Sequence, residues 1–161
     1  MPEMEYAGEK NSAGQRHGKG IISFTDGDTY EGDFTNDNIN GKGTFKFCYG
    51  DIYDGEWKNG QFHGHGIYHC AEGGSYEGEY KNDCKEGNGT MKYSNSEEYN
   101  GEWKDNFRHG NGVMKYANGD VYSGSFQYDN KNGKGELKFS NGDIYDGIFR
   151  FDKMHRKGVM K

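Results

Sequence analysis

A tyrosine recurs through the chain at a fixed spacing, and this period limits the folds that the chain can adopt. After a first interval of 24 residues every interval is 23, which places the tyrosines at Tyr6, Tyr30, Tyr53, Tyr76, Tyr99, Tyr122 and Tyr145. Glycines stand two, eleven and thirteen residues after each tyrosine, one residue later for the last two in the first copy, and only Arg156 breaks this pattern. A period of this length is typical of repeat proteins. We therefore predict a repeat array over residues 6–161, preceded by a tail of residues 1–5.

Polar and apolar residues alternate within each copy. Tyr53, Gly55 and Trp57 share one face of a predicted strand, and Asp54, Glu56 and Lys58 share the other. A second strand begins at His63, and the sequences DGD, NGD and YGD before the next tyrosine are typical of tight turns. Each copy is thus a β-hairpin. The predicted fold is all-β, an elongated single-layer antiparallel β-meander built from about seven 23-residue hairpins.

The composition explains how one layer could be stable. Leu, Ile, Val and Phe make up only about 13% of the chain, whereas aromatic residues reach 16%. Such a chain lacks the aliphatic residues for a thick core, but its rings can lie against glycine backbone of a neighbouring strand, where a close approach is allowed. The glycines to which we assign this structural role are Gly32, Gly55, Gly64, Gly66, Gly78, Gly101, Gly110 and Gly112.

The repeated segments YDGEWKNGQFHGHG, YNGEWKDNFRHGNG and YEGDFTNDNINGKG resemble the MORN repeat (membrane occupation and recognition nexus), with seven copies in register. The resemblance implies an elongated antiparallel ribbon that serves as a scaffold or partner-binding groove and has no catalysis of its own. The chain departs from the repeat at Ser96, a turn position, at Arg156, and at three positions where histidine is frequent, namely Asn40, Glu86 and Asn132. These departures put the local turn geometry in question, not the fold.

The opening segment YAGEKNSAGQRHGKG has one inserted residue and is followed by DTYEG. In this it is similar to the first repeat of the MORN-type radial spoke head proteins of motile cilia. The similarity covers about thirty residues, and it implies a cytoskeletal component of the ciliary axoneme.

We expect the aromatic face to bind a protein partner, because a single layer leaves part of such a face exposed. The ligand would be a helix or an extended segment laid along an aromatic groove. The predicted groove residues are Tyr30, Phe34, Tyr53, Trp57, Tyr76, Tyr80, Tyr99, Trp103, Tyr122 and Phe126. An unpaired strand edge in the last copy would also permit end-to-end self-association.

Two other functions deserve comparison with this one. A membrane-tethering module that binds acidic phospholipid is disfavoured, because the chain has a net charge of −6 and its lysines alternate with acidic residues. The same charge argues against nucleic acid as a partner. An accessory region of an enzyme would need a second domain, for which this sequence leaves no room.

The sequence also contains motifs that resemble chemical sites. The Gly-x-Gly pairs lack the third glycine and following helix of a nucleotide-binding loop. In HGHGIYHC the residues His63, His65, His69 and Cys70 could suggest a metal site, but histidines recur every 46 residues, so His63 is a repeat position. We predict no enzyme activity, no cofactor and no metal. The odd number of cysteines, at Cys48, Cys70 and Cys84, favours a reducing cytoplasm.

Overall fold

A computed structural model describes residues 3–155 and 158–161, so Arg156 lies outside the described residues. The chain divides into two compact units, the first ending at Cys84 and the second beginning at Lys85. We describe each unit by itself. All regular elements of the described residues are β-strands, and no helix among them is long and apolar enough to cross a membrane.

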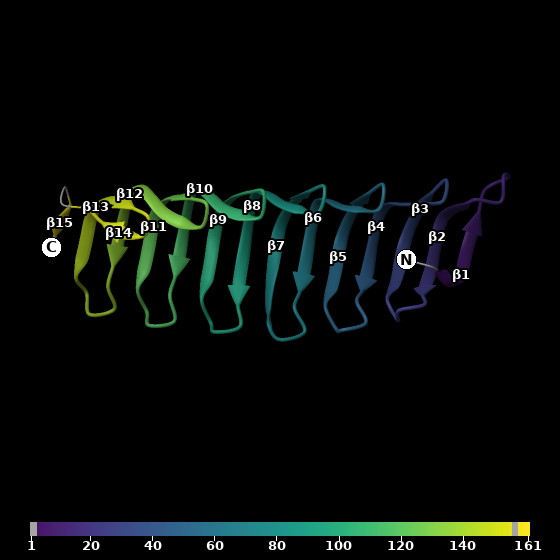
Figure 1. The fold of residues 1–161 in the computed structure, drawn as a ribbon, viewed down its shortest axis with the longest axis horizontal. Helices are drawn as coiled ribbons and strands as arrows, with labels where there is room; N and C mark the ends of the chain where they lie inside the picture. Colours follow the sequence, from purple (N-terminus) through teal and green to yellow (C-terminus); the bar gives the residue numbers. More distant parts are fainter. Residues whose placement is uncertain (1–2, 156–157) are drawn as a thin grey trace. The chain divides into compact units, whose positions relative to one another are not determined.

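The first unit is an antiparallel meander in which each strand pairs with the next one along the chain (Figure 1). Its strands are β1 (Glu3–Lys10), β2 (Arg16–Phe24), β3 (Thr29–Thr35), β4 (Asn38–Lys46), β5 (Ile52–Lys58), β6 (Gln61–His69) and β7 (Gly74–Lys81).

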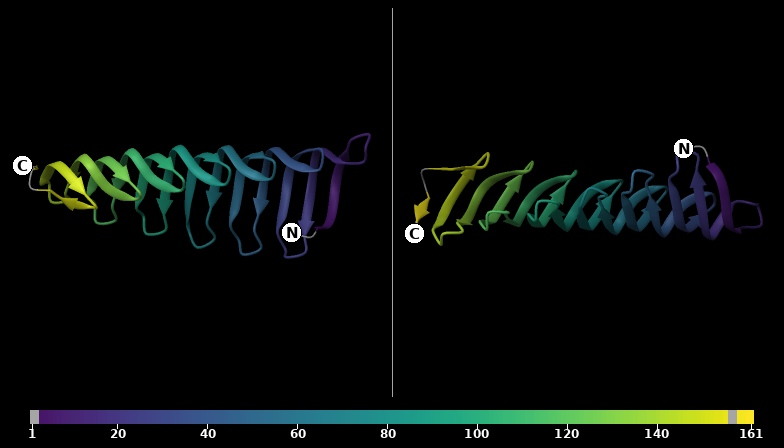
Figure 2. Two further views of the ribbon diagram at one scale, coloured as in Figure 1. Left: turned by 45° about the horizontal axis from the view of Figure 1, so that its top comes forward. Right: turned by 90° about the horizontal axis from the view of Figure 1, so that it is seen from below.

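The second unit continues the same pattern of pairing. Its strands are β8 (Cys84–Tyr93, which takes its first residue from the first unit), β9 (Glu98–Lys104), β10 (Phe107–Lys115), β11 (Val121–Gln127), β12 (Asn130–Lys138), β13 (Ile144–Arg150), β14 (Lys153–Met154) and β15 (Val159–Met160). The short strands β14 and β15 both pair with β13. Within each unit the strands lie side by side in one layer (Figure 2). The predicted all-β antiparallel meander of hairpins is thus confirmed.

A row of glycines crosses each unit from strand to strand. In the first unit the register pairs Gly32 with Gly43, and Gly43 with Gly55. The rings of Tyr30 and Phe34 belong to the same strand, yet their centroids are only 5.3 Å apart. Four residues of a straight strand span about 13 Å. The strand therefore bends toward its aromatic side at the glycine, and we call that side the ring face and the opposite side the outer face.

The glycine row leaves room for the tyrosines. A Cβ atom added at Gly43 would overlap the hydroxyl and ring of Tyr30, and one added at Gly135 would lie 2.5 Å from the ring and hydroxyl of Tyr122. Gly64 has a different task, because its φ of +57° is one that side chains disfavour. The glycines of the sequence pattern therefore include close-packing positions and a left-handed backbone position.

In each unit the turns lie at the two ends of the strands, and the two ends have different turns. We call these two rows of turns the edges of the unit. At one edge, two-residue turns join the two strands of a hairpin, and both turn residues have positive φ, as in Asn36 (47°) and Asp37 (69°). This is the geometry of a type I′ turn. At the other edge the turn between hairpins uses a left-handed glycine such as Gly119, with φ 88°. Ser96 replaces that glycine in one turn and adopts φ 70°, so the turn geometry that the sequence left in question is retained there.

Candidate binding surfaces

All ten of the predicted groove residues lie on the ring face, and all ten are buried. Their exposed fractions are 0% for Tyr30, Tyr53, Tyr99 and Tyr122, and at most 6% for the remaining six. The repeat thus brings the predicted residues together, but it brings them together as a core. Their role in partner binding stays a prediction.

Each core tyrosine is held by a hydrogen bond to its own strand. The hydroxyl of Tyr53 donates to the carbonyl of Glu56 at 2.9 Å, and that of Tyr122 donates to Ser125 at 2.9 Å. Tyr30, Tyr76 and Tyr99 repeat this bond to the residue three positions later. Burial raises the pKa of the Tyr122 phenol to about 12 and also raises the pKa values of Tyr30, Tyr53 and Tyr99. These phenols therefore stay neutral at physiological pH.

Within each unit, core tyrosines also join consecutive hairpins. Tyr53 makes edge-to-face contacts with Trp57 of its own hairpin (5.1 Å between centroids) and with Tyr80 of the next hairpin (5.3 Å). In the second unit Tyr122 contacts Phe126 at 5.1 Å and Phe149 at 4.9 Å in the same way. Edge-to-face pairs at such distances add to the stabilisation from area burial. The core is therefore a continuous aromatic row within each unit.

A second set of aromatic side chains on the ring face remains partly open to solvent. It lies two residues beyond the buried positions of the second strands, and we call it the half-buried aromatic row: Phe24, Phe47, Tyr93, Tyr116 and Phe139. Phe47 packs on Phe45 (4.7 Å) and stacks with Tyr49 (5.2 Å), whose side chain is 63% exposed. The sequence carries a signal for this row. Its members continue the alternation of apolar residues at every second position, and they stand at or directly after the end of the second strand of each hairpin.

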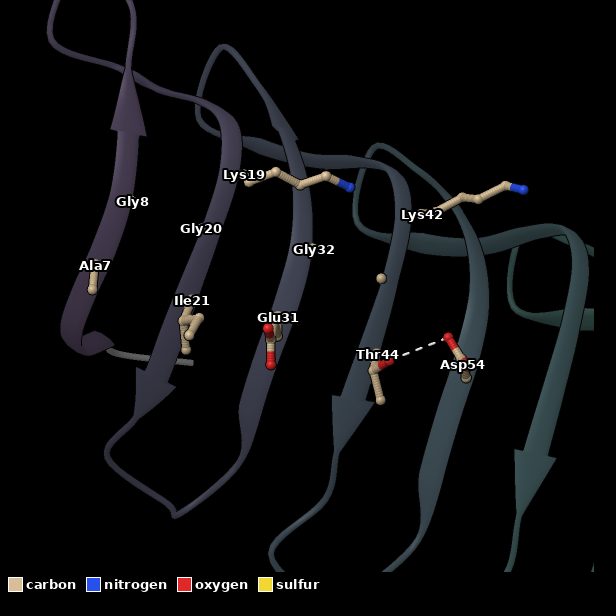
Figure 3. Close-up of a pocket in the computed structure, with 11 residues that line it drawn as sticks. Ala7, Gly8, Lys19, Gly20, Ile21, Glu31, Gly32, Lys42, Thr44 and Asp54 are labelled. Carbon is tan, nitrogen blue, oxygen red and sulfur yellow. Dashed lines mark hydrogen bonds between the residues drawn. The ribbon is translucent and has the colours of Figure 1, made fainter.

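The outer face has a shallow depression over the glycine row of the first unit, with a volume of about 590 Å³ (Figure 3). Lys19 and Lys42 flank one side, while Ile21, Glu31, Thr44 and Asp54 flank the other. Lys19 forms an ion pair with Asp33 at 2.6 Å. Partial burial would raise the pKa of the Asp33 carboxyl, but hydrogen bonds from the Lys19 side chain and the Lys42 amide outweigh it and lower that pKa. The depression is therefore a balanced array of charges.

The corresponding depression of the second unit, of about 560 Å³, is lined by amides and hydroxyls. Its residues include Asn88, Asn100, Asn111 and Ser123, with Glu102 as its one ionisable group. The outer faces of the two units thus differ in charge although their backbones repeat.

The two-residue turns form an edge that also differs between the units. In the first unit their first positions are Asn36, Asn59 and Asn82. In the second unit they are Asp105, Tyr128 and Phe151. Tyr128 is 64% exposed, Phe151 is 75% exposed, and the ring of Tyr128 lies 5.9 Å from that of Phe107, which is 43% exposed. We call Phe107, Tyr128 and Phe151 the aromatic turn edge.

Sequence reasoning missed two series of side chains that tie consecutive hairpins together. Asp37 accepts a hydrogen bond from the amide of Arg16, Asp129 from that of Arg108, and both bonds are 2.8 Å long. At the other edge Asp28, which is only 4% exposed, accepts from the amide of Cys48 at 2.7 Å. In the sequence, the recurrence of aspartate two residues before a tyrosine is a signal for the second series.

Among the described residues, no three His, Cys, Asp or Glu side chains come together in a group that could hold a metal ion. The side chain of His65 approaches Glu77 (3.9 Å). The side chains of Cys48 and Cys70 are exposed, and that of Cys84 is half-buried.

Comparisons with known proteins agree with this description. The family model of the MORN repeat matches residues 6–29, 30–52, 53–75, 76–97, 99–121, 122–144 and 145–161. Among curated proteins, no sequence matches the chain.

Two solved structures share the fold. One is the TCP domain of Drosophila melanogaster SAS-4 in complex with a proline-rich motif of Ana2. It is 14% identical with a TM-score of 0.50, and the match covers 92% of this chain and 86% of that one. The other is the TCP10 domain of Danio rerio CPAP in complex with a STIL peptide. It is 12% identical with a TM-score of 0.51, and the match covers 88% of this chain and 63% of that one.

Proposed function

Because the chain belongs to the MORN-repeat family, we propose that it is a non-catalytic scaffold that binds a protein partner along the ring face of its hairpins. The buried rings form the floor of this surface, and the half-buried aromatic row supplies the side chains that a partner would contact. A helix or an extended segment would fit such a row, since either can present an apolar side chain to each hairpin in turn.

The observation that carries this proposal is the cluster around Phe47. Phe45 is buried in the core, Phe47 is half-buried on top of it, and Tyr49 continues the stack into solvent. Tyr68 adds a further ring 6.0 Å from Phe47. Partly exposed rings next to a rigid aromatic core are typical of the anchor positions of interfaces.

The comparisons support a peptide as the partner. The SAS-4 domain was solved with a proline-rich motif and the CPAP domain with a STIL peptide, so sheets of this fold can accept a peptide segment. The opening segment, with its similarity to radial spoke head repeats, supports a cytoplasmic location in the cytoskeleton or the axoneme of a cilium.

The test is an affinity capture from extract of the source cell with matched variants. Phe47→Ser and Phe139→Ser remove one ring from the half-buried row of each unit, and both variants are first checked for a native circular dichroism spectrum. Ile21→Ser and Val113→Ser serve as controls, because these apolar residues belong to the outer face. Ile21 is 44% exposed.

We expect the control variants to retain a partner that the Phe47 and Phe139 variants lose. Equal capture by all four variants would contradict the proposal and point to the turn edges. Loss in the Ile21 and Val113 variants alone would assign binding to the outer face.

A further inference from the structure

We propose that the aromatic turn edge of the second unit, formed by Phe107, Tyr128 and Phe151, is a second binding surface whose ligand is a proline-rich segment in the polyproline II conformation. This proposal goes beyond the scaffold function, because the surface lies at the two-residue turns between β9 and β10, β11 and β12, and β13 and β14. In Figure 1 these turns follow the upper edge of the unit. The half-buried aromatic row is not part of it.

The fold does not need aromatic residues at these turns, because the first unit has asparagine at the same positions. Tyr128 has φ 48° and Phe151 has φ 46°, and the corresponding Asn36, Asn59 and Asn82 have φ between 47° and 50°. Asparagine tolerates this left-handed region, whereas a bulky side chain there is an outlier. Strained positions of this kind cluster at functional sites. Tyr128 and Phe151 are therefore the residues of this edge that folding alone explains least.

The three aromatic side chains of this edge are exposed to solvent. Phe107, Tyr128 and Phe151 are 43%, 64% and 75% exposed, while the first unit has only polar side chains at the first position of its turns. The rings of Phe107 and Tyr128 are 5.9 Å apart, and His109 lies 6.1 Å from Tyr128. Phe107, Tyr128 and His109 therefore form a contiguous ring surface, and Phe151 adds an exposed ring at the next turn. Aromatic side chains in such a position are typical anchors of interfaces.

The spacing of the turns matches the repeat of a polyproline II helix. Equivalent turns of consecutive hairpins are two strands apart, or about 9.6 Å along the direction in which strands stack. A polyproline II helix repeats every three residues, which corresponds to ~9.3 Å. A proline-rich segment laid along the edge can therefore place a proline against each successive turn. An extended β-segment presents side chains on one face every ~6.6 Å, and two turns of a helix span ~10.8 Å, so the polyproline II repeat is the closest match to the spacing of these turns.

The chemistry of the edge agrees with that ligand. Proline-rich segments dock on aromatic side chains, and their backbone carbonyls make no internal hydrogen bonds. The exposed Tyr128 hydroxyl can donate to such a carbonyl. The unit itself holds 13 Lys and Arg against 11 Asp and Glu, whereas the first unit holds 7 against 15. An uncharged proline segment needs no counter-charge on a unit whose charges nearly balance.

The experiment titrates the full chain with a peptide of about 12 prolines, which spans ~37 Å as polyproline II. A Gly-Ser peptide of equal length is the control ligand. Binding is followed by isothermal titration calorimetry and by changes of the tyrosine signals in NMR. We expect saturable binding of the proline peptide only. Tyr128→Asn should weaken it at least tenfold, because that ring stands between the other two turns, and Phe151→Asn should weaken it less.

Both substitutions introduce the residue that the first unit already uses at the same backbone angles, so the variants should fold. Asn59→Tyr, which adds a ring to the first unit, is the matched control and should leave the affinity unchanged. Absence of binding up to about 1 mM, or equal affinity in all variants, would overturn the proposal. A second contrary result is possible with vesicles of phosphatidylserine and phosphatidylcholine. If wild type binds these vesicles, the Tyr128 and Phe151 variants do not, and the proline peptide does not bind, then the edge contacts membrane and the proposal is overturned. These results are independent of the affinity capture with Phe47→Ser and Phe139→Ser, which tests the scaffold function of the ring face.

Discussion

The two units repeat the same backbone, yet they differ where the backbone meets solvent. The glycine row, the buried tyrosines and the type I′ turns recur in both. At the first turn position the first unit has Asn36, Asn59 and Asn82, and the second has Asp105, Tyr128 and Phe151. The charges differ too, with a formal net charge of −8 for residues 1–84 and +2 for residues 85–161, which together give the −6 of the chain. The features that both units share therefore include those that the fold needs, and the features that differ at the turns are ones that the fold does not require.

The largest predicted effect concerns the buried phenols that both units share. Tyr30 and Tyr53 in the first unit, and Tyr99 and Tyr122 in the second, have pKa values raised by burial from the ordinary value of 10.0. A raised pKa means that this stabilisation is complete below pH 10 and is lost as the pH rises through the folded-state value. Between pH 10 and the folded-state pKa, each tyrosine lowers the free energy of unfolding by at most ~1.4 kcal/mol per pH unit. Screening by solvent makes the actual value smaller.

We therefore expect cooperative alkaline unfolding of both units above pH 10. Urea titrations at increasing pH, followed by circular dichroism and by tyrosinate absorbance, measure it. An unfolding free energy that stays constant while the tyrosines ionise would contradict the buried environment described here.

The next effect tests whether the glycine row is equivalent in the two units. Gly43→Ala and Gly135→Ala each place a methyl group against a core tyrosine. Both should lower the free energy of unfolding by about 3 kcal/mol, near the upper end for overpacking, because the neighbour is a fixed ring. Chemical denaturation of each variant gives the values. A loss below about 1 kcal/mol at either site would show that the tyrosine of that unit can move aside.

A smaller effect distinguishes two equivalent aspartates. Asp28 is 4% exposed and accepts the Cys48 amide at 2.7 Å, and Asp120 is half-buried and accepts the Ser140 amide at 2.9 Å. Replacement by alanine leaves an amide without its acceptor, which costs ~1–3 kcal/mol when it is buried. We expect Asp28→Ala to reduce thermal stability more than Asp120→Ala. The Asn variants keep an acceptor oxygen and should lie closer to wild type. The reverse order would mean that burial does not determine the strength of these ties.

The smallest effect addresses the turns directly. Tyr128→Asn and Phe151→Asn should raise the free energy of unfolding by up to ~1 kcal/mol, because asparagine tolerates a left-handed backbone better than an aromatic residue. Asn59→Tyr should lower it by a similar amount. Differential scanning calorimetry on the three variants is sufficient. If Tyr128→Asn and Phe151→Asn proved less stable than wild type, the rings would contribute to folding. The turn residues would then not separate binding from stability.

The period of the tyrosines was enough to predict the hairpins, their antiparallel order and the face to which the rings belong. It could not predict the bend. A straight strand would have left Tyr30 and Phe34 apart and open to a partner, whereas the bend at Gly32 folds one ring onto the other and buries both. That bend depends on two neighbouring strands having glycine opposite each other, a property of register that a single repeat does not display.

Within each unit, the contact of a core tyrosine with the following hairpin has a consequence for how such chains change length. Because the ring of Tyr30 meets Trp57 (5.3 Å) as Tyr53 meets Tyr80, excision of one whole period would leave two faces that already match. Gene duplication or loss in steps of 23 codons could then lengthen or shorten the protein without redesigning any junction.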